Sequence, residues 1–244
     1  MNIRDENVLR ELNLYPLWVR RDMSAVEEVA PVVPVAEVCV AESIPAVPAT
    51  VSTVRSEQTA VATDWSGLKL QVRDCTACKL RAGCTQTVFG VGDENADWLF
   101  VGEGPGADED AQGEPFVGQA GKLLDNMLAA IKLKRGANVY IANIVKCRPP
   151  NNRTPEADEI ATCLPYLQQQ IALIKPKLIV ALGKTAATSL LGRDATLGSL
   201  RGTVHEYQGV PLIVTYHPAY LLRSPAEKAK AWQDLCFAVQ RMNT

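Results

Sequence analysis

Four short apolar segments alternate with helical segments in the last two thirds of the chain, and this alternation constrains the fold more than any other feature. The apolar segments are ADWLFVGEG, NVYIANIVK, PKLIVALG and VPLIVTYHP. Amphipathic stretches of helical character cover residues 119–132, 155–174, 184–191 and 226–242. Strands that alternate with helices form a parallel sheet with helices on both faces. The sequence therefore predicts an α/β fold.

The residues that follow these apolar segments are candidates for a binding site, because ligands gather beyond the carboxyl ends of parallel strands. Gly102, Glu103 and Gly104 follow the first segment, Asn143 ends the core of the second, and His217 follows the last. Each of these residues alone could serve an ordinary turn or cap. Their shared position at strand ends favours a functional site.

The chain is predicted to have three parts. Residues 1–28 space several leucines and a tryptophan as a short amphipathic helix does. Residues 29–64 are rich in Ala, Val, Pro, Ser and Thr, which is typical of a disordered linker. Residues 65–244 have the pattern of a globular domain.

Charge and hydropathy restrict the possible partners only weakly. Residues 1–65 carry 5 Lys and Arg against 10 Asp and Glu, whereas residues 66–244 carry 20 against 17. The slight basic excess of the second part does not by itself indicate nucleic-acid binding. We expect a cytoplasmic protein without membrane association, because no apolar leader precedes the first cysteines and no apolar run reaches the ~20 residues that span a bilayer.

Four of the seven cysteines have a context that suggests metal binding. Cys75 and Cys78 form a C-x2-C pair in a polar, basic loop, and Cys147 and Cys163 can supply the two further ligands that such a pair needs. The spacing leaves a zinc site and an iron–sulfur cluster both open. The ordinary alternative is that these cysteines are small buried apolar residues.

The segment VGEGPGADEDAQGEPFVGQAGKLLDNML is a glycine-rich turn that leads from the first apolar segment into a helix. It contains no GxxxxGK[ST], which excludes a P-loop, and it does not fit GxGxxG. A glycine-rich turn after a strand is weak evidence of function until it is combined with other motifs.

Six motifs occur in order along residues 66–242. They are GEGPGADED (102–110), GEPFVGQAGKLLD (113–125), NIVKCRPPNNRTP (143–155), Cys163, LIVALGKTA (178–186) and YHPAYLLR (216–223). In these motifs the chain resembles the type 4 uracil-DNA glycosylases, a family of iron–sulfur enzymes. The resemblance implies a three-layer α/β/α sandwich with a four-stranded parallel sheet, and a [4Fe-4S] cluster held by Cys75, Cys78, Cys147 and Cys163.

The resemblance also implies an activity, which is hydrolysis of the N-glycosidic bond of deoxyuridine in DNA. Such a DNA glycosylase releases uracil and leaves an abasic site for base-excision repair. The reaction develops negative charge on uracil, and donors aimed at that charge are expected to dominate catalysis. His217 is suited to donate to the uracil O2 oxygen, and Glu103 to orient water or to stabilise the cationic sugar.

Uracil and DNA contacts follow from the same resemblance, because the base must leave the duplex stack before it reacts. Phe116 offers a stacking face, Asn143 can pair with the uracil edge, and the backbone at Gly102 and Gly104 can approach the ring. The expected DNA contacts are a wedge of Tyr220, Leu221 and Leu222, and phosphate-binding cations at Lys146, Arg148, Arg153 and Arg223.

An alternative interpretation is a non-catalytic nucleic-acid-binding or replication-associated module of the same fold. The stretch LRELNLYPLWVRR also faintly resembles the opening of the psi subunit of bacterial DNA polymerase III. On that resemblance residues 1–21 would bind a replisome or clamp-loader partner as a tethered helix. Apart from this partner we expect a monomer.

Overall fold

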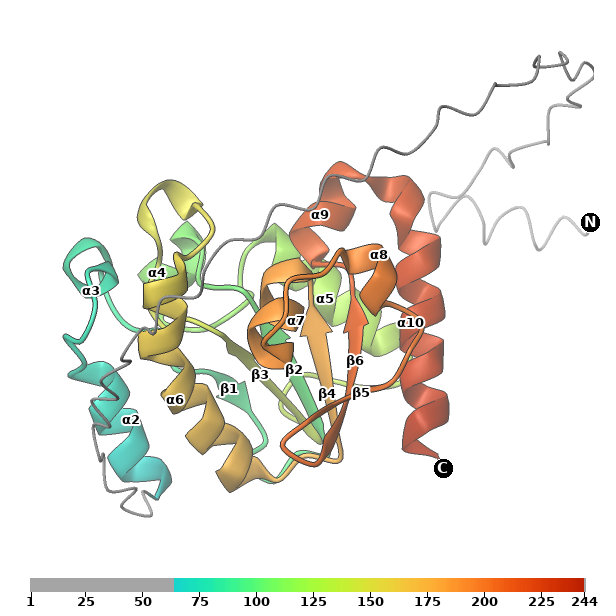
Figure 1. The fold of residues 1–244 in the computed structure, drawn as a ribbon, viewed down its shortest axis with the longest axis horizontal. Coiled ribbons are helices and arrows are strands. Elements are labelled where there is room, and N and C mark those ends of the chain that lie inside the picture. Colours follow the sequence, from blue (N-terminus) through green and yellow to red (C-terminus); the bar gives the residue numbers. More distant parts are fainter. Residues whose placement is uncertain (1–63, 244) are drawn as a thin grey trace, which may run out of the picture. The chain divides into compact units, whose positions relative to one another are not determined.

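The computed structural model describes residues 64–243, and their centre is a mixed sheet in the order β1-β3-β2-β4-β6-β5 (Figure 1). The strands are β1 (Val91–Gly92), β2 (Trp98–Gly102), β3 (Val139–Asn143), β4 (Leu178–Leu182), β5 (His205–Tyr207) and β6 (Val210–Thr215). The four central strands are mutually parallel. The edge strands β1 and β5 run antiparallel to their neighbours. The carboxyl ends of the central strands therefore meet at one edge of the sheet.

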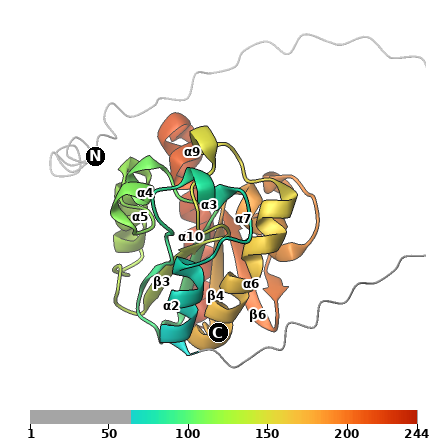
Figure 2. The same cartoon turned by 90° about the vertical axis from the view of Figure 1, so that its left-hand side faces the viewer.

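Helices cover both faces of this sheet (Figures 1 and 2). They are α2 (Trp65–Arg73), α3 (Leu80–Gly83), α4 (Ala107–Gln112), α5 (Gln119–Ala130), α6 (Ala157–Ile174), α7 (Lys184–Leu191), α8 (Leu197–Leu200), α9 (Pro218–Arg223) and α10 (Lys228–Met242), with 3-10 turns η1 (Pro150–Asn152) and η2 (Pro225–Glu227). Side chains of α6, α7 and α8 join one core cluster, and those of α5 and α10 join another. The result is a three-layer α/β/α arrangement.

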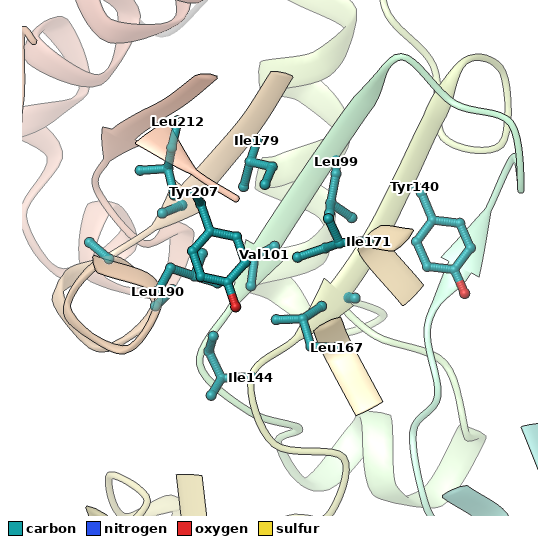
Figure 3. Close-up of a cluster of buried hydrophobic side chains, with 14 of the residues drawn as sticks. Leu99, Val101, Tyr140, Ile144, Leu167, Ile171, Ile179, Leu190, Tyr207 and Leu212 are labelled. Atoms are coloured by element: carbon teal, nitrogen blue, oxygen red, sulfur yellow. The ribbon is translucent and has the colours of Figure 1, made fainter. Parts of the chain in front are cut away.

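The two core clusters arise because neighbouring residues of a strand point to opposite faces. Leu99 and Val101 of β2 join the cluster under α6 and α7, which Figure 3 shows, whereas Trp98 and Phe100 join the cluster under α5 and α10. Every residue of β2, β3 and β4 is buried. This burial explains why the strands read as continuous apolar runs instead of alternating ones.

The prediction of a four-stranded sheet was wrong in strand number, because the described sheet has six strands. The four predicted strands form its parallel centre. β1 has only two residues, and β5 is a three-residue segment, HEY, without an apolar run, so neither has a sequence signal of its own. The helix prediction for residues 184–191 matches α7, and the other three predicted helices differ from α5, α6 and α10 by two residues at one end.

The predicted amphipathic helix in residues 1–28 and all but the last residue of the predicted linker 29–64 lie outside the described residues. Asp64, which ends that predicted linker, is the N-cap of α2, and its Oδ1 accepts a hydrogen bond of 2.7 Å from the Gly67 backbone N–H. Within the described part of the chain, each helix is too short or too polar to cross a membrane.

Candidate active site and cysteine centre

A cleft of about 460 Å³ opens at the carboxyl ends of the parallel strands. Predicted site residues in its lining are Glu103, Gly104, Phe116, Asn143, Arg153, His217, Tyr220 and Arg223. Further lining residues are Pro105, Gly106, Glu109, Ala120, Pro149, Asn152, Thr154 and Ala219. The structure thus brings together residues from four of the six sequence motifs. Gly102, Arg148, Leu221 and Leu222 are not part of this lining.

Asn143 ends β3 at the floor of the cleft, and its side chain is unusual. The residue is 2% exposed, and its Oδ1 has no hydrogen-bond partner in the described structure. Burying a polar atom without a partner costs about 1–3 kcal/mol, so such an atom in a cleft indicates a missing ligand. The strand register places Asn143 beside Gly102, where a Cβ would lie only 2.4 Å from Oδ1. Gly102 therefore makes room for the Asn143 amide.

Phe116 is held in a strained backbone conformation beside this amide. Its φ is 56°, in the left-handed region that a residue with a side chain adopts only at a cost. Arg135 stabilises this turn by donating hydrogen bonds of 2.8 Å to the carbonyl oxygens of Pro115 and Phe116. Gly121 permits the close approach of α5, because a Cβ there would lie 1.7 Å from the Phe116 oxygen.

His217 follows β6 and packs against Phe116, with ring centroids 5.5 Å apart and planes at 31°. Its Nδ1 accepts a hydrogen bond of 3.2 Å from the Ala219 backbone N–H. The proton of the neutral ring is therefore on Nε2. Burial and, to a smaller extent, the positive charge of Arg223 lower the pKa of His217 to about 4, although Glu109 opposes the change. The imidazole is consequently a neutral Nε2–H donor at physiological pH.

Glu109 is a residue of the cleft lining that the sequence analysis did not single out. Its carboxylate accepts hydrogen bonds from the backbone N–H groups of Gly106 at 3.0 Å, Val117 at 3.0 Å and Gly118 at 3.1 Å. It therefore ties the start of α4 to the turn that carries Phe116. The signal in the sequence is a carboxylate three residues after a glycine at a helix start, where it can accept from free backbone N–H groups.

The comparison with known proteins agrees with this geometry. The model of the uracil DNA glycosylase superfamily matches residues 89–236. A type-4 uracil-DNA glycosylase of Pyrobaculum aerophilum is 45% identical over 174 residues, which cover 67% of this chain and 87% of the relative. Those of Archaeoglobus fulgidus and Thermotoga maritima are 45% and 44% identical, and cover 64% and 66% of this chain and 81% and 84% of the relatives. The chain belongs to the type-4 uracil-DNA glycosylase family. The family resemblance noted in the sequence is thereby confirmed.

In this member of the family, the three residues of α9 that were predicted as a DNA wedge differ in their exposure to solvent. Tyr220 is 40% exposed and Leu222 is 43% exposed, but Leu221 is 1% exposed. The inclusion of Leu221 in the wedge was therefore wrong, because its side chain packs inside the protein. Tyr220 stacks on Tyr216 at 5.5 Å with planes at 9°, and the Arg201 guanidinium lies 4.4 Å from the centre of the Tyr216 ring.

The predicted phosphate-binding cations have different surroundings in the structure. Arg223 is exposed at the rim of the cleft. Arg148 is half-buried, and its Nε donates a hydrogen bond of 2.7 Å to Asn152 Oδ1. Arg153 forms a two-pronged ion pair of 2.8 and 2.6 Å with the buried Glu159, whose pKa it lowers to about 2. The Arg153 guanidinium is therefore already engaged at the start of α6.

Lys146 was wrongly predicted as a phosphate contact, because it is 1% exposed. Its Nζ donates to the Asn143 backbone oxygen at 2.9 Å and to Gln170 Oε1 at 2.7 Å. Burial lowers the pKa of Lys146 to about 8, and the neighbouring Cys163 opposes this change. A lysine in a polar motif gives no sequence signal of such burial.

The four cysteines with a metal-binding context come together around one small cavity. Cys75, Cys78, Cys147 and Cys163 all line it, although the C-x2-C pair and Cys163 are far apart in the sequence. The Lys146 backbone N–H points at Cys163 Sγ, 3.2 Å away. Burial raises the pKa values of the Cys147 and Cys163 thiols. Without an added cation these sulfurs would therefore stay protonated, so metal binding must release protons.

The grouping of these sulfurs bears on whether they would hold a single zinc ion or an iron–sulfur cluster. A single zinc ion holds four sulfurs at ~2.3 Å and therefore only about 3.8 Å from one another. Within residues 64–243, no three His, Cys, Asp or Glu side chains are grouped closely enough to hold one metal ion. A [4Fe-4S] cluster binds each cysteine through a different iron, so its four thiolates stand further apart. The grouping of the described side chains therefore does not match a single metal ion, and the four cysteines around the cavity are the donor type that an iron–sulfur cluster takes.

Proposed function

We propose that the protein is a uracil-DNA glycosylase that hydrolyses the N-glycosidic bond of deoxyuridine in DNA, releasing uracil and leaving an abasic site. The unpaired Oδ1 of Asn143 carries this proposal. Uracil offers an N3–H donor beside an O4 acceptor, and one carboxamide can accept from the first and donate to the second. Membership in the type-4 family supports the same substrate.

Uracil enters the cleft as a flipped base and stacks on Phe116. The Nε2–H of His217 donates to uracil O2, and this hydrogen bond strengthens as negative charge develops on the departing base. A neutral imidazole suits this role because its proton stays on the ring after the bond breaks. The hydrogen bond from Ala219 to Nδ1 fixes the required tautomer before substrate arrives.

Glu103 lies in the cleft lining and orients the attacking water while it stabilises the positive charge that develops on the sugar. Gly104 next to it leaves the backbone N–H groups of the turn accessible to the ring. A Cβ at Gly104 would lie 2.8 Å from a Val145 methyl group, so the turn can pack this closely on the segment after β3 only without a side chain.

We further propose that Cys75, Cys78, Cys147 and Cys163 hold a [4Fe-4S] cluster. When bound, the cluster supplies a structural crosslink that ties the loop before α3 to the segment between β3 and α6. That segment begins next to Asn143, and Arg148 lies on it beside the cluster. The crosslink thus supports both the cleft floor and a surface for the DNA backbone.

Release of free uracil from a uracil-containing oligonucleotide tests the function. We expect release from a U·G duplex, none from a matched T·A duplex, and weakened discrimination against cytosine in Asn143→Asp, whose side chain loses its donor. Asn95→Asp, an exposed change in a turn, is the matched control. A protein that binds the uracil duplex without releasing base would be a non-catalytic nucleic-acid-binding module instead.

The division of the chain also belongs to this proposal. Residues 65–244 form the catalytic domain, which acts as a monomer, and residues 1–21 recruit a replication partner through the linker 29–64. Deleting residues 1–63 should leave uracil release unchanged, because every cleft and cavity residue lies after them. Loss of release or of cooperative unfolding in this deletion would show that the segment belongs to the catalytic domain.

A further inference from the structure

Lys146 is a buried cation whose charge has no anionic side-chain partner among the described residues. Its ammonium group donates to two neutral oxygens, the Asn143 carbonyl at 2.9 Å and Gln170 Oε1 at 2.7 Å. None of the ion pairs found in residues 64–243 includes it. Gln170 is itself fully buried and is held by its Nε2–H, which donates to the Phe89 oxygen at 2.9 Å.

Neutral oxygens satisfy the hydrogen bonds of a buried ammonium group but not its charge. A lone charge away from water is costly, and proteins bury one where an opposite charge lies nearby. Lys146 lines the same cavity as the four cysteines, and its backbone N–H reaches Cys163 Sγ at 3.2 Å. A [4Fe-4S] group with four thiolates carries net negative charge, because the thiolates outweigh the positive core.

We propose that Lys146 is the internal counter-ion of the iron–sulfur cluster and a positioning residue that couples the cluster to uracil recognition. The coupling runs through the Asn143 carbonyl, which accepts from the ammonium group, while the same residue lines the cleft and has an unpaired side-chain Oδ1. This inference rests on the proposed function and on the proposed cluster. It assigns to the cluster an electrostatic effect on the site in addition to crosslinking.

The charge half of the proposal is tested by the midpoint potential of the cluster, measured by protein-film voltammetry on the full-length holoprotein. Lys146→Met keeps the length and volume of the side chain but removes its charge, so the oxidised cluster is favoured and the potential falls. Lys177→Met is the control. Lys177 is an exposed lysine directly before the amino end of β4, away from the cleft, and it is paired with Asp97. We expect its potential to stay at the wild-type value.

The coupling half is tested by equilibrium binding to a duplex that carries a non-hydrolysable deoxyuridine analogue, with a thymidine duplex as reference. Loss of a hydrogen bond from a charged group to the Asn143 carbonyl should weaken the preference for the analogue roughly tenfold. Lys177→Met should keep the full preference. An unchanged preference in cluster-loaded Lys146→Met would overturn the coupling.

If Lys146→Met does not retain the cluster, Gln170→Glu provides a second test of the midpoint potential. It leaves the ammonium group in place and adds a carboxylate beside it, so the potential should also fall. If the midpoint potentials of both variants equal that of the wild type, the proposal that Lys146 is the counter-ion is overturned. If only Gln170→Glu folds, a wild-type potential in that variant overturns it. A wild-type protein without a cluster, or one that releases no uracil, would instead refute the proposed function, so the two failures are distinguishable.

Discussion

The carbonyl oxygen of Phe116 accepts a hydrogen bond of 2.8 Å from the Arg135 guanidinium, which holds the aromatic residue in its left-handed conformation. The same guanidinium donates to the Pro115 oxygen and pairs with Asp125 at 3.0 Å. Arg135 does not line the cleft, so we expect it to affect uracil binding only through the position of the Phe116 ring.

Arg135→Met should reduce kcat/KM for uracil release roughly tenfold, because the turn loses charged hydrogen bonds of about 1.5–3 kcal/mol each in its strained conformation. Single-turnover cleavage measures the effect. Asp125→Asn removes the half-exposed partner of Arg135 but leaves both carbonyl bonds, and it should cleave nearly as the wild type does. Equal losses in the two variants would argue against the role of the carbonyl bonds.

Gly102→Ala should lower cleavage by at least about a hundredfold, since a small displacement of binding groups can have that effect. The added Cβ would lie 2.4 Å from Asn143 Oδ1 and 2.6 Å from Phe116 Cζ, so both side chains must move. Gly198→Ala is the control, because a Cβ there meets no atom within 4 Å. Wild-type cleavage by Gly102→Ala would contradict the close approach that the structure shows.

His217 should make folding stability depend on pH between about 4 and 6.5. Its pKa is about 4 in the folded protein and 6.5 ordinarily, so between these values the unfolded chain binds more protons. The contribution to stability is complete above pH 6.5 and is lost as the pH falls. From pH 7 to pH 5 the wild type should lose about 2 kcal/mol of unfolding free energy that His217→Gln does not lose.

Urea unfolding at the two pH values measures this difference. The only other histidine of the chain is His205, and His205→Gln is the control for the loss of a histidine outside the cleft. If His217→Gln kept the same loss between pH 7 and pH 5, the low pKa of His217 would be refuted.

Neighbouring leucines of α9 should respond in opposite ways to truncation. Leu221→Ala should lower the unfolding free energy by about 2–5 kcal/mol, because Leu221 is 1% exposed. Leu222→Ala should leave stability within about 0.5 kcal/mol but weaken cleavage of duplex substrate more than of single-stranded substrate, because Leu222 is exposed and available as a wedge. Equal activity of Leu222→Ala and wild type on both substrates would remove Leu222 from the wedge.

The choice of cluster ligands can be checked by the visible absorbance of the purified protein. Cys147→Ala and Cys163→Ala should lose the brown colour and part of their stability, because cluster binding contributes to folding. Cys84→Ser should keep the colour, although Cys84 lies close enough to Cys147 to influence the pKa of its thiol. Loss of colour in Cys84→Ser would show that the ligand set is wrong.

Much of the site could be predicted from the sequence because its residues lie in short motifs at strand ends. Glu103, Asn143 and His217 follow apolar runs whose length and composition indicate buried parallel strands, and such strands must bring their carboxyl ends together. Arg135 and Glu109 escaped this reasoning. They act on backbone groups of a turn, and a turn of this kind has no periodic pattern from which its hydrogen-bond partners could be read.

The sequence by itself determined the family, the parallel centre of the sheet and the choice of four cysteines as candidate metal ligands, because these depend on local patterns and motif order. Only the tertiary structure decided that Lys146 and Leu221 are buried, that Arg153 is paired with Glu159, and that Asn143 Oδ1 is unpaired. The physical reason is that burial and hydrogen-bond satisfaction depend on contacts between distant segments. Gln170, for example, lies 24 residues after the lysine whose ammonium group it binds.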